Sequence, residues 1–506
     1  MTRHALARLT HLLIPAALAS LGLISCGGGG ASSGTAASSA GSSVASSVSS
    51  AASSSVSSAK SSSMASSSAA ASASSAASSS QSTSSSQASS ASSASSATSS
   101  SATSSAPSAA CDALENRLRA TTLTVSGKAA VNDEYTPAII TPRANGSSLL
   151  AWTDSTAKTI RLANLASNDT LGSNLPNLTG LEVHAGLAIG DAVALAVVDN
   201  DPDIYSSKYC QGASTPSNNV CGKMDLVRLD GSGNTLTRTT LTKKNNVDSV
   251  GAIFTWWYAH TARLATDGSR IGVYFRSAGS YERPGVAGEV DIHAGDTLRF
   301  VDASTGALQS GGWEWGCSHS WSVRLGYNGS RWGAACHGDA YPNALQVARL
   351  SSPTAASSNL QWQGSTDATQ RALGGLVPAS DGFWINYVQP GNSLQLAKVP
   401  NSGTALTQQV SISAATGMDA TYPFRPYMAA YGSDKLLLGW KASGKLVLAV
   451  ASATTGAVLE GPVTTNLNID RFQDMVTAPN GDVVWAYSRG DTRIDVNRVA
   501  SCKLAN

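Results

Sequence analysis

Short apolar segments separated by tight turns recur through residues 111–506 of the chain. The clearest pair is RLATDGSRIG at 263–272 and RLGYNGSRWG at 324–333, which match without a gap at six positions and lie 61 residues apart (324 − 263). An Asp-Gly or Asn-Gly pair between two apolar strands is the strongest short-range signal for a β-hairpin, whose type I′ turn needs positive φ at both central residues. The two segments therefore predict the same hairpin twice.

Five weaker copies of this hairpin begin at residues 141, 184, 376, 428 and 475. Each has a short apolar strand, a turn and a second strand, which carries an aromatic residue in all copies but the one at 184. A third strand follows each hairpin, and the last five of these begin at 298, 345, 394, 446 and 494, or 47, 49, 52 and 48 residues apart. Seven such units predict an all-β fold, a seven-bladed β-propeller with four-stranded blades of roughly 50–60 residues.

The two ends of this region are expected to meet in one blade. The last repeat stops after its third strand, and the strand-like segment TTLTVSGKAAV from Thr121 precedes the first hairpin. This segment can supply the missing outer strand of the last blade. A disulfide between Cys111 and Cys502 would then fasten the closed ring.

The first 25 residues have the pattern of a secretory signal peptide. Arg3 and Arg8 precede an apolar stretch from Leu12 to Ile24, which is too short and too broken to be a good membrane-spanning helix. The tetrad LISC that ends at Cys26 resembles the bacterial lipobox. This resemblance implies cleavage before Cys26 and lipidation of its sulfur and its nitrogen. The residue after Cys26 is not Asp, which in Gram-negative lipoproteins points to the outer membrane.

Residues 26–110 are expected to form a disordered, Ser/Ala-rich tether behind the lipidated cysteine. From Gly27 to Ala110 the chain is nearly all Ser, Ala, Gly and Thr, with Lys60 as its only charged residue and no aromatic residue. Such a segment has too little apolar surface to offset the entropy of ordering it. Poly-serine tracts of this kind resemble linkers of secreted polysaccharide-degrading systems. Residues 1–25, 26–110 and 111–506 are therefore the predicted signal peptide, tether and propeller.

The charge of the chain argues against a nucleic-acid partner. Its net charge is +2, charged residues make up 13% of it, and no run of Lys and Arg is present. A protein that coats a nucleic acid needs a basic surface of a size that this composition does not supply. The partners we expect are a membrane, through the lipid anchor, and a polysaccharide or another protein of the cell envelope.

Six cysteines remain when Cys26 is set aside, and an even number in an exported chain favours disulfides. Six cysteines allow fifteen pairings, of which their positions favour one. The predicted bonds are Cys111–Cys502, Cys210–Cys221 and Cys317–Cys336. No cysteine pair has the C-x-x-C spacing of a zinc or redox site.

Several polar residues lie at or just before predicted innermost strands, which face the central channel of a propeller. His260 and His319 precede the two best-matched hairpins, and His184 opens a third. In one interpretation these side chains belong to the hydrogen-bonded scaffold of the repeat. In the other, a polyanion or sugar site is formed by His260, Arg263, His319, Arg324, His337 and Tyr341.

The second interpretation is similar, in architecture and residue types only, to the propeller-fold polysaccharide lyases. In that family an Arg or a metal ion neutralises a uronate carboxylate, and a His or Tyr removes the C5 proton. No motif of that family matches position by position, and the sialidase, WD and kelch signatures are absent from the sequence.

Two smaller features add candidate ligand sites. Trp257 and Trp315 lie in predicted loops before strands, where they could stack on sugar rings or pack between blades. Asp199, Asp201 and Asp203 alternate in DNDPDIY, which suggests a calcium loop. The Gly and the distal Glu of an EF-hand are absent, which favours the alternative, a solvated loop. Ca²⁺ is the one cofactor that the sequence suggests.

These observations predict an outer-membrane, lipid-anchored protein whose propeller binds a ligand at one axial face, with a glycan as the favoured ligand. One alternative is a propeller-type polysaccharide lyase. Another is a scaffold for protein interactions in the cell envelope.

Overall fold

The computed structural model describes residues 112–131, 136–200, 222–243, 252–255, 261–282, 290–319, 322–338, 343–362, 372–389, 393–418 and 425–501. The predicted signal peptide and tether lie outside these residues. So do several of the predicted site residues and disulfide partners: Cys26, Cys111, Asp201, Asp203, Cys210, Cys221, Trp257, His260, Tyr341 and Cys502. Among the described residues, no helix is both long enough and apolar enough to cross a membrane.

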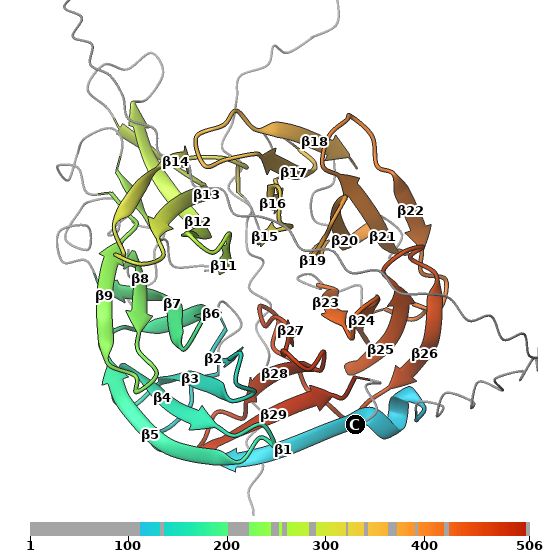
Figure 1. Cartoon of the computed structure of the whole chain (residues 1–506), viewed down its shortest axis with the longest axis horizontal. Helices are drawn as coiled ribbons and strands as arrows, with labels where there is room; N and C mark the ends of the chain where they lie inside the picture. Colours follow the sequence, from blue (N-terminus) through green and yellow to red (C-terminus); the bar gives the residue numbers. More distant parts are fainter. Residues whose placement is uncertain are drawn as a thin grey trace, which may run out of the picture. The chain divides into compact units, whose positions relative to one another are not determined.

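Seven antiparallel sheets hold the described strands, and each sheet forms one blade of a ring (Figure 1). The predicted seven-bladed β-propeller is thereby confirmed. The first blade runs outward through β2 (Ala138–Pro142), β3 (Ser148–Asp154), β4 (Thr159–Leu165) and β5 (Leu171–Leu178). The second runs through β6 (Glu182–Ile189), β7 (Ala192–Asn200), β8 (Gly222–Leu229) and β9 (Thr235–Thr240). The third holds β10 (Ile253–Phe254), β11 (Ala262–Thr266), β12 (Arg270–Glu282), β13 (Val290–Asp302) and β14 (Leu308–Trp313).

The remaining blades repeat the same order of strands. The fourth holds β15 (Val323–Tyr327), β16 (Trp332–His337), β17 (Leu345–Leu350) and β18 (Ser358–Trp362). The fifth holds β19 (Ala372–Ala379), β20 (Gly382–Gln389), β21 (Ser393–Pro400) and β22 (Gln408–Ser411). The sixth holds β23 (Tyr427–Tyr431), β24 (Lys435–Ala442), β25 (Lys445–Ser452) and β26 (Val458–Thr464). The seventh holds β27 (Val476–Thr477), β28 (Val483–Ser488), β29 (Arg493–Val499) and β1 (Leu118–Thr124).

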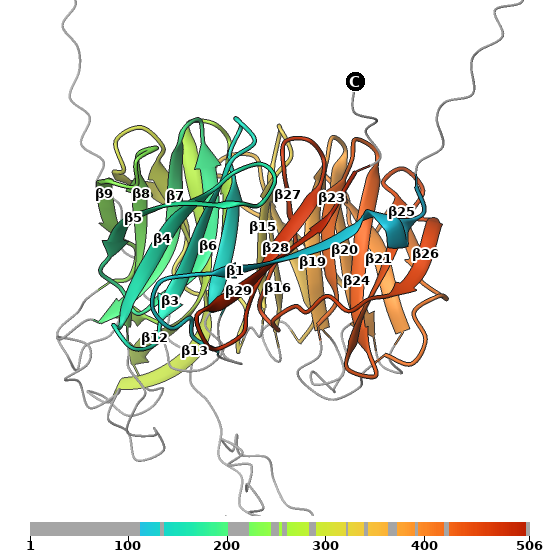
Figure 2. The same cartoon turned by 90° about the horizontal axis from the view of Figure 1, so that it is seen from below.

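The innermost strand of each blade begins at one face of the ring, which we call the lower face. β12 pairs with β11 as far as Phe275 and then continues past the start of β11 together with β13. The hairpin of β12 and β13 therefore projects beyond the lower face, on the lower side of Figure 2. At 13 residues each, these two strands are the longest that the structure describes.

The repeated hairpin turn is held by an Asx side chain. Asp267 Oδ1 accepts hydrogen bonds from the backbone N–H groups two and three residues further on, at 2.9 and 2.7 Å. Asn328 makes the same two bonds, at 3.1 and 2.9 Å. Positive φ occurs at Gly268 and Gly329 but not at Asp267 or Asn328, so the predicted type I′ turn is wrong at both copies. At both copies the turn is stabilised by hydrogen bonds from its backbone to the Asx side chain, with one glycine in the left-handed conformation.

The core of the protein lies between blades. Seven hydrophobic clusters are formed by the described residues, and each combines side chains of two neighbouring blades. Five tryptophans with at most 1% of their surface exposed fill these interfaces: Trp152, Trp332, Trp384, Trp440 and Trp485. For these residues packing between blades is the observed role.

The ring is closed by the segment predicted for this purpose. β1 pairs with β29 over seven residues, from Leu118 opposite Val499 to Thr124 opposite Arg493. The 3₁₀ helix η1 (Leu114–Arg117) precedes β1. Its Arg117 donates a hydrogen bond of 2.6 Å to the Tyr431 hydroxyl of the sixth blade and forms an ion pair with Glu460 of the same blade. The closing strand is thus attached to two blades.

Replacement of Arg117 by Ala should destabilise the ring, because the Tyr431 hydroxyl and the Glu460 carboxylate lose a buried cationic donor. We expect a loss of about 2–3 kcal/mol, typical for hydrogen bonds to a charged group. Chemical denaturation of the purified protein measures this loss. Arg119→Ala is the matched control, because that arginine is half exposed in its ion pair with Asp169 and should contribute less than about 1 kcal/mol. Equal losses in both variants would contradict the role assigned to Arg117.

Candidate functional site

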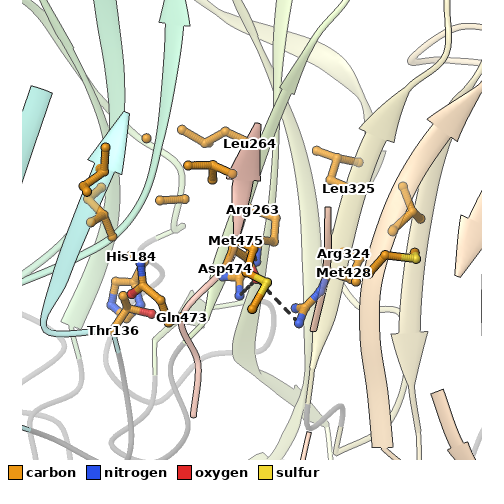
Figure 3. Close-up of a pocket in the computed structure, with 17 residues that line it drawn as sticks. Thr136, His184, Arg263, Leu264, Arg324, Leu325, Met428, Gln473, Asp474 and Met475 are labelled. Carbon is orange, nitrogen blue, oxygen red and sulfur yellow. Dashed lines mark hydrogen bonds and ion pairs between the residues drawn. The ribbon is translucent and has the colours of Figure 1, made fainter. Parts of the chain in front are cut away.

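A cavity of about 140 Å³ lies in the central channel and is lined from all seven blades, mostly by residues at or just before the beginning of the innermost strands. Figure 3 shows its polar side chains converging from several blades. Each blade contributes to the lining, in chain order with Ile139, His184, Arg263, Arg324, Leu376, Met428 and Asp474. Because the innermost strands begin at the lower face, the cavity belongs to that part of the channel.

Arg263 and Arg324 occupy the same position in adjacent blades, as the second residue of β11 and of β15. Both guanidinium groups meet the Asp474 carboxylate, which precedes β27 on the other side of the channel (Figure 3). Arg263 Nη2 donates to Asp474 Oδ1 at 2.8 Å, and Arg324 Nη2 lies 3.6 Å from the same oxygen. The structure therefore brings these two predicted site residues together at the axis.

A third arginine, Arg425, joins this group from the residues just before β23. Its guanidinium stacks on the Phe472 ring at 4.5 Å and is 5% exposed. Burial, and then repulsion by Arg324 and Arg263, holds the pKa of Arg425 well below its ordinary value. We call Arg263, Arg324, Arg425 and Asp474 the axial cluster.

The pKa values of the other members reflect the same crowding of charge. Burial, and to a smaller extent the Arg263 cation, lowers the pKa of Arg324 to about 10. Burial acts to raise the pKa of Asp474, but the combined attraction of the three arginines holds that pKa below its ordinary value. The Asp474 carboxylate is therefore charged at neutral pH.

Sequence reasoning missed Arg425 and Asp474, although the available signal was the right one. His260 is a candidate because it lies three residues before Arg263, at the predicted start of an innermost strand. Arg425 lies three residues before Met428, and Asp474 directly precedes the hairpin at 475. The same rule, applied to the sixth and seventh blades, identifies both residues.

The described histidines do not assemble around the cavity as a set. His184 lines it and lies 2.9 Å from Glu182 through Nε2. His337 is buried at the end of β16 and His319 lies in the segment between β14 and β15, and neither lines the cavity. Of the predicted site residues His260, His319 and His337, the structure describes the last two, and neither of them lies at the cavity.

Trp315 lies instead on the projecting hairpin. A Cβ atom added to Gly295 of β13 would come within 2.5 Å of the indole Nε1 and 2.7 Å of Cδ1, so the five-membered ring covers this glycine. The His293 ring lies 5.6 Å from the indole and 4.5 Å from the His319 ring. Trp315 keeps 40% of its surface exposed. We call Trp315, His293 and His319 the aromatic shelf.

The segment that carries Trp315 is fastened on both sides. Asp296 accepts hydrogen bonds from Trp313 Nε1 at 3.0 Å and from the Cys317 backbone N–H at 3.1 Å. The predicted disulfide between Cys317 and Cys336 is present, with 6.3 Å between the Cα atoms. The Asp296 carboxylate and the two sulfurs lie within 4.8 Å of one another. Because metal binding requires thiolates, the disulfide form of this group is not a metal site.

Of the three aspartates of the predicted calcium loop, the structure describes Asp199 alone. This carboxylate lies 3.1 Å from Arg238 Nη1, which also pairs with Asp225 at 2.8 Å. An ion pair of this kind competes with a cation for the same oxygen.

No family model and no curated protein matches the chain. A chain in the crystal structure of the mitotic checkpoint complex is 12% identical, with 75% of this chain and 95% of that chain covered and a TM-score of 0.43. Aleuria aurantia lectin in complex with alpha-methyl-L-fucoside is 13% identical, with 67% of this chain and 100% of that chain covered and a TM-score of 0.36. Oligogalacturonate lyase from Vibrio parahaemolyticus is 11% identical, with 76% of this chain and 97% of that chain covered and a TM-score of 0.39. The assignment of the fold as a seven-bladed β-propeller rests on the seven sheets of this structure.

The stability of the shelf should depend on pH through Asp296. Burial raises the pKa of this carboxyl group to about 7, against 3.8 for an ordinary Asp. The folded state thus holds its proton more tightly than the unfolded state, and this stabilisation is lost as the pH rises from about 4 through about 7. We expect the Tm to fall between pH 5 and pH 8, which scanning calorimetry measures.

Asp296→Asn should flatten this fall, since an amide keeps an acceptor oxygen and carries no charge. Asp302→Asn is the control, because hydrogen bonds from Ser304 and Thr305 hold the pKa of Asp302 well below its ordinary value. The control should keep the slope of wild type between pH 5 and pH 8. A slope that survives in Asp296→Asn would show that another group causes the pH dependence.

Proposed function

We propose that this protein is an outer-membrane lipoprotein whose propeller binds a glycan at its lower face. The observation that carries this proposal is the exposure of Trp315. The five tryptophans of the blade interfaces are at most 1% exposed, whereas Trp315 has 40% of its surface open to solvent. Tryptophan is enriched at binding surfaces because it combines a large apolar ring with a polar N–H group, so this exposed indole is the candidate contact for a ligand.

The geometry of Trp315 suits a sugar ring. One side of the indole is occupied by the backbone of β13 at Gly295, so the ring lies against the hairpin as a flat surface. The electron-rich face of an indole attracts the polarised C–H groups of a pyranose. His293 and His319, which lie beside it, are side chains that exchange hydrogen bonds with hydroxyl groups.

The shelf is also rigid before a ligand arrives. The Asp296 hydrogen bonds and the Cys317–Cys336 disulfide hold the segment on which Trp315 lies. Pre-organisation of this kind lowers the entropy cost of binding, which favours weak ligands such as sugars.

Lipidation of Cys26 and a flexible segment 26–110 complete the proposal. A flexible chain of about 80 residues spans about 50 Å on average, which would let the ring sample glycans at some distance from its membrane. Cleavage before Cys26 would leave this tether at the start of the mature protein.

Removal of the indole tests the proposal. The purified protein is run through gels that contain neutral or uronate-bearing polysaccharides, and its retardation reports binding. On the polysaccharides that retard wild type, Trp315→Ala should weaken binding at least tenfold, or about 1.4 kcal/mol, because the stacking surface is lost. Trp315→Phe should retain part of the affinity.

Trp362→Ala is the matched control, because Trp362 is a partly buried tryptophan of the fourth blade that packs on Tyr387. It should bind like wild type. The proposal is wrong if no polysaccharide of the panel retards the protein, or if both alanine variants lose affinity equally.

A further inference from the structure

The axial cluster has more positive than negative charge. Among the described residues, the Asp474 carboxylate pairs with the guanidinium groups of Arg263 and Arg324, and Arg425 adds a third buried cation that helps to lower the pKa of Asp474. These four described residues carry a formal charge of +2. Arg263, Arg324 and Arg425 are 6%, 4% and 5% exposed. A charge removed from water without a partner is costly, so proteins normally pair buried cations.

Three buried nitrogens of the cluster make no hydrogen bond to the described residues: Nε of Arg263, Nε of Arg324 and Nη1 of Arg425. Nε of Arg263 lies in the ion pair with Asp474, so the other two have no partner among the described residues. The same guanidinium of Arg324 does bond elsewhere, through Nη1 to the carbonyl oxygen of Val323 at 2.6 Å. The side chain is therefore held in place while one of its donors stays unused.

The arginines cannot relieve this repulsion by turning away. Arg263 donates to the carbonyl oxygens of Ala262 at 2.6 Å and Phe472 at 2.9 Å. Arg425 is held against the Phe472 ring. The donors are thus fixed in space before any ligand binds, as in sites that recognise planar or tetrahedral anions through Arg.

We propose that the axial cluster is a binding site for an oxyanion, with Arg263 and Arg324, which line the cavity, as its donors and Arg425 as a further positive charge beside them. The cavity of about 140 Å³ holds one such group with a few water molecules and is smaller than a site for a whole drug-sized ligand. A dianion would cancel the formal charge of +2, and a carboxylate would halve it. This site goes beyond the proposed glycan shelf and stands without it.

The oxyanion can come from two sources, a free inorganic ion or the acid group of a sugar. The experiment therefore titrates the full chain with sodium sulfate and with sodium glucuronate, against sodium chloride at equal ionic strength. The Tm should rise by several degrees with at least one oxyanion relative to chloride. A response at tenfold lower concentration identifies the preferred source.

Arg425→Gln separates specific binding from the general stabilising effect of sulfate. Without an oxyanion its Tm should equal or exceed that of wild type, because repulsion on Arg263 and Arg324 is removed. With an oxyanion its shift should fall to the chloride level. Arg493→Gln is the matched control, since that arginine is half exposed in its pair with Asp491, and it should shift like wild type.

The proposal is overturned if no oxyanion raises the Tm above chloride, or if Arg425→Gln keeps the whole shift. A Tm of Arg425→Gln several degrees below wild type without oxyanion would also overturn it, as a structural arginine behaves in that way. Arg324→Lys, which keeps the charge and loses Nε, should fold and bind at least tenfold more weakly in calorimetric titration. Trp315→Ala should keep the oxyanion shift, so failure of the shelf and failure of this site are distinguishable.

Discussion

The pairing of β1 with β29 is the interaction on which the rest of the structure depends. The seventh blade takes its outer strand from the beginning of the described chain and its other three strands from the end, so this pairing joins the two ends of the ring. The closing blade is also bound to the first by charge. Arg498 of β29 donates to Asp169 of the first blade at 2.9 Å and to Asp482 of its own blade at 3.0 Å. Closure therefore fixes both neighbours of the seventh blade, from which Asp474 reaches the channel.

Packing between blades explains the repeat that the sequence displays. Gly272 and Gly333 are equivalent, and an added Cβ atom would meet Trp332 of the next blade at 2.7 Å in the first case and Phe383 at 2.7 Å in the second. Each of these two glycines thus makes room for an aromatic ring of the following blade. The hairpins, their period and the closing strand could be predicted because they depend on residues close in sequence or repeated at a regular interval.

The axial cluster could be predicted only in part, for a physical reason. Arg263 and Arg324 stand in the repeat, but their carboxylate partner comes from the opposite side of the ring, 211 residues after Arg263. The shelf shows the same limit: the loop position of Trp315 suggested exposure, whereas the glycine beneath it belongs to another strand. Neither pairing leaves a local pattern, because both depend on how complete blades are arranged.

Rigidity of the ring is what allows like charges to stay together in the channel. Three guanidinium groups in a flexible scaffold would separate until water or a carboxylate reached each of them. Here the innermost strands are held from outside by seven hydrophobic clusters and by the closed last blade. The repulsion among Arg263, Arg324 and Arg425 is therefore borne by the fold as a whole, and strain of this kind persists where surrounding structure over-determines a site. Folding has already ordered these donors and brought their like charges together. An anion bound in the channel would therefore not have to order them, and more of the electrostatic attraction would contribute to its affinity.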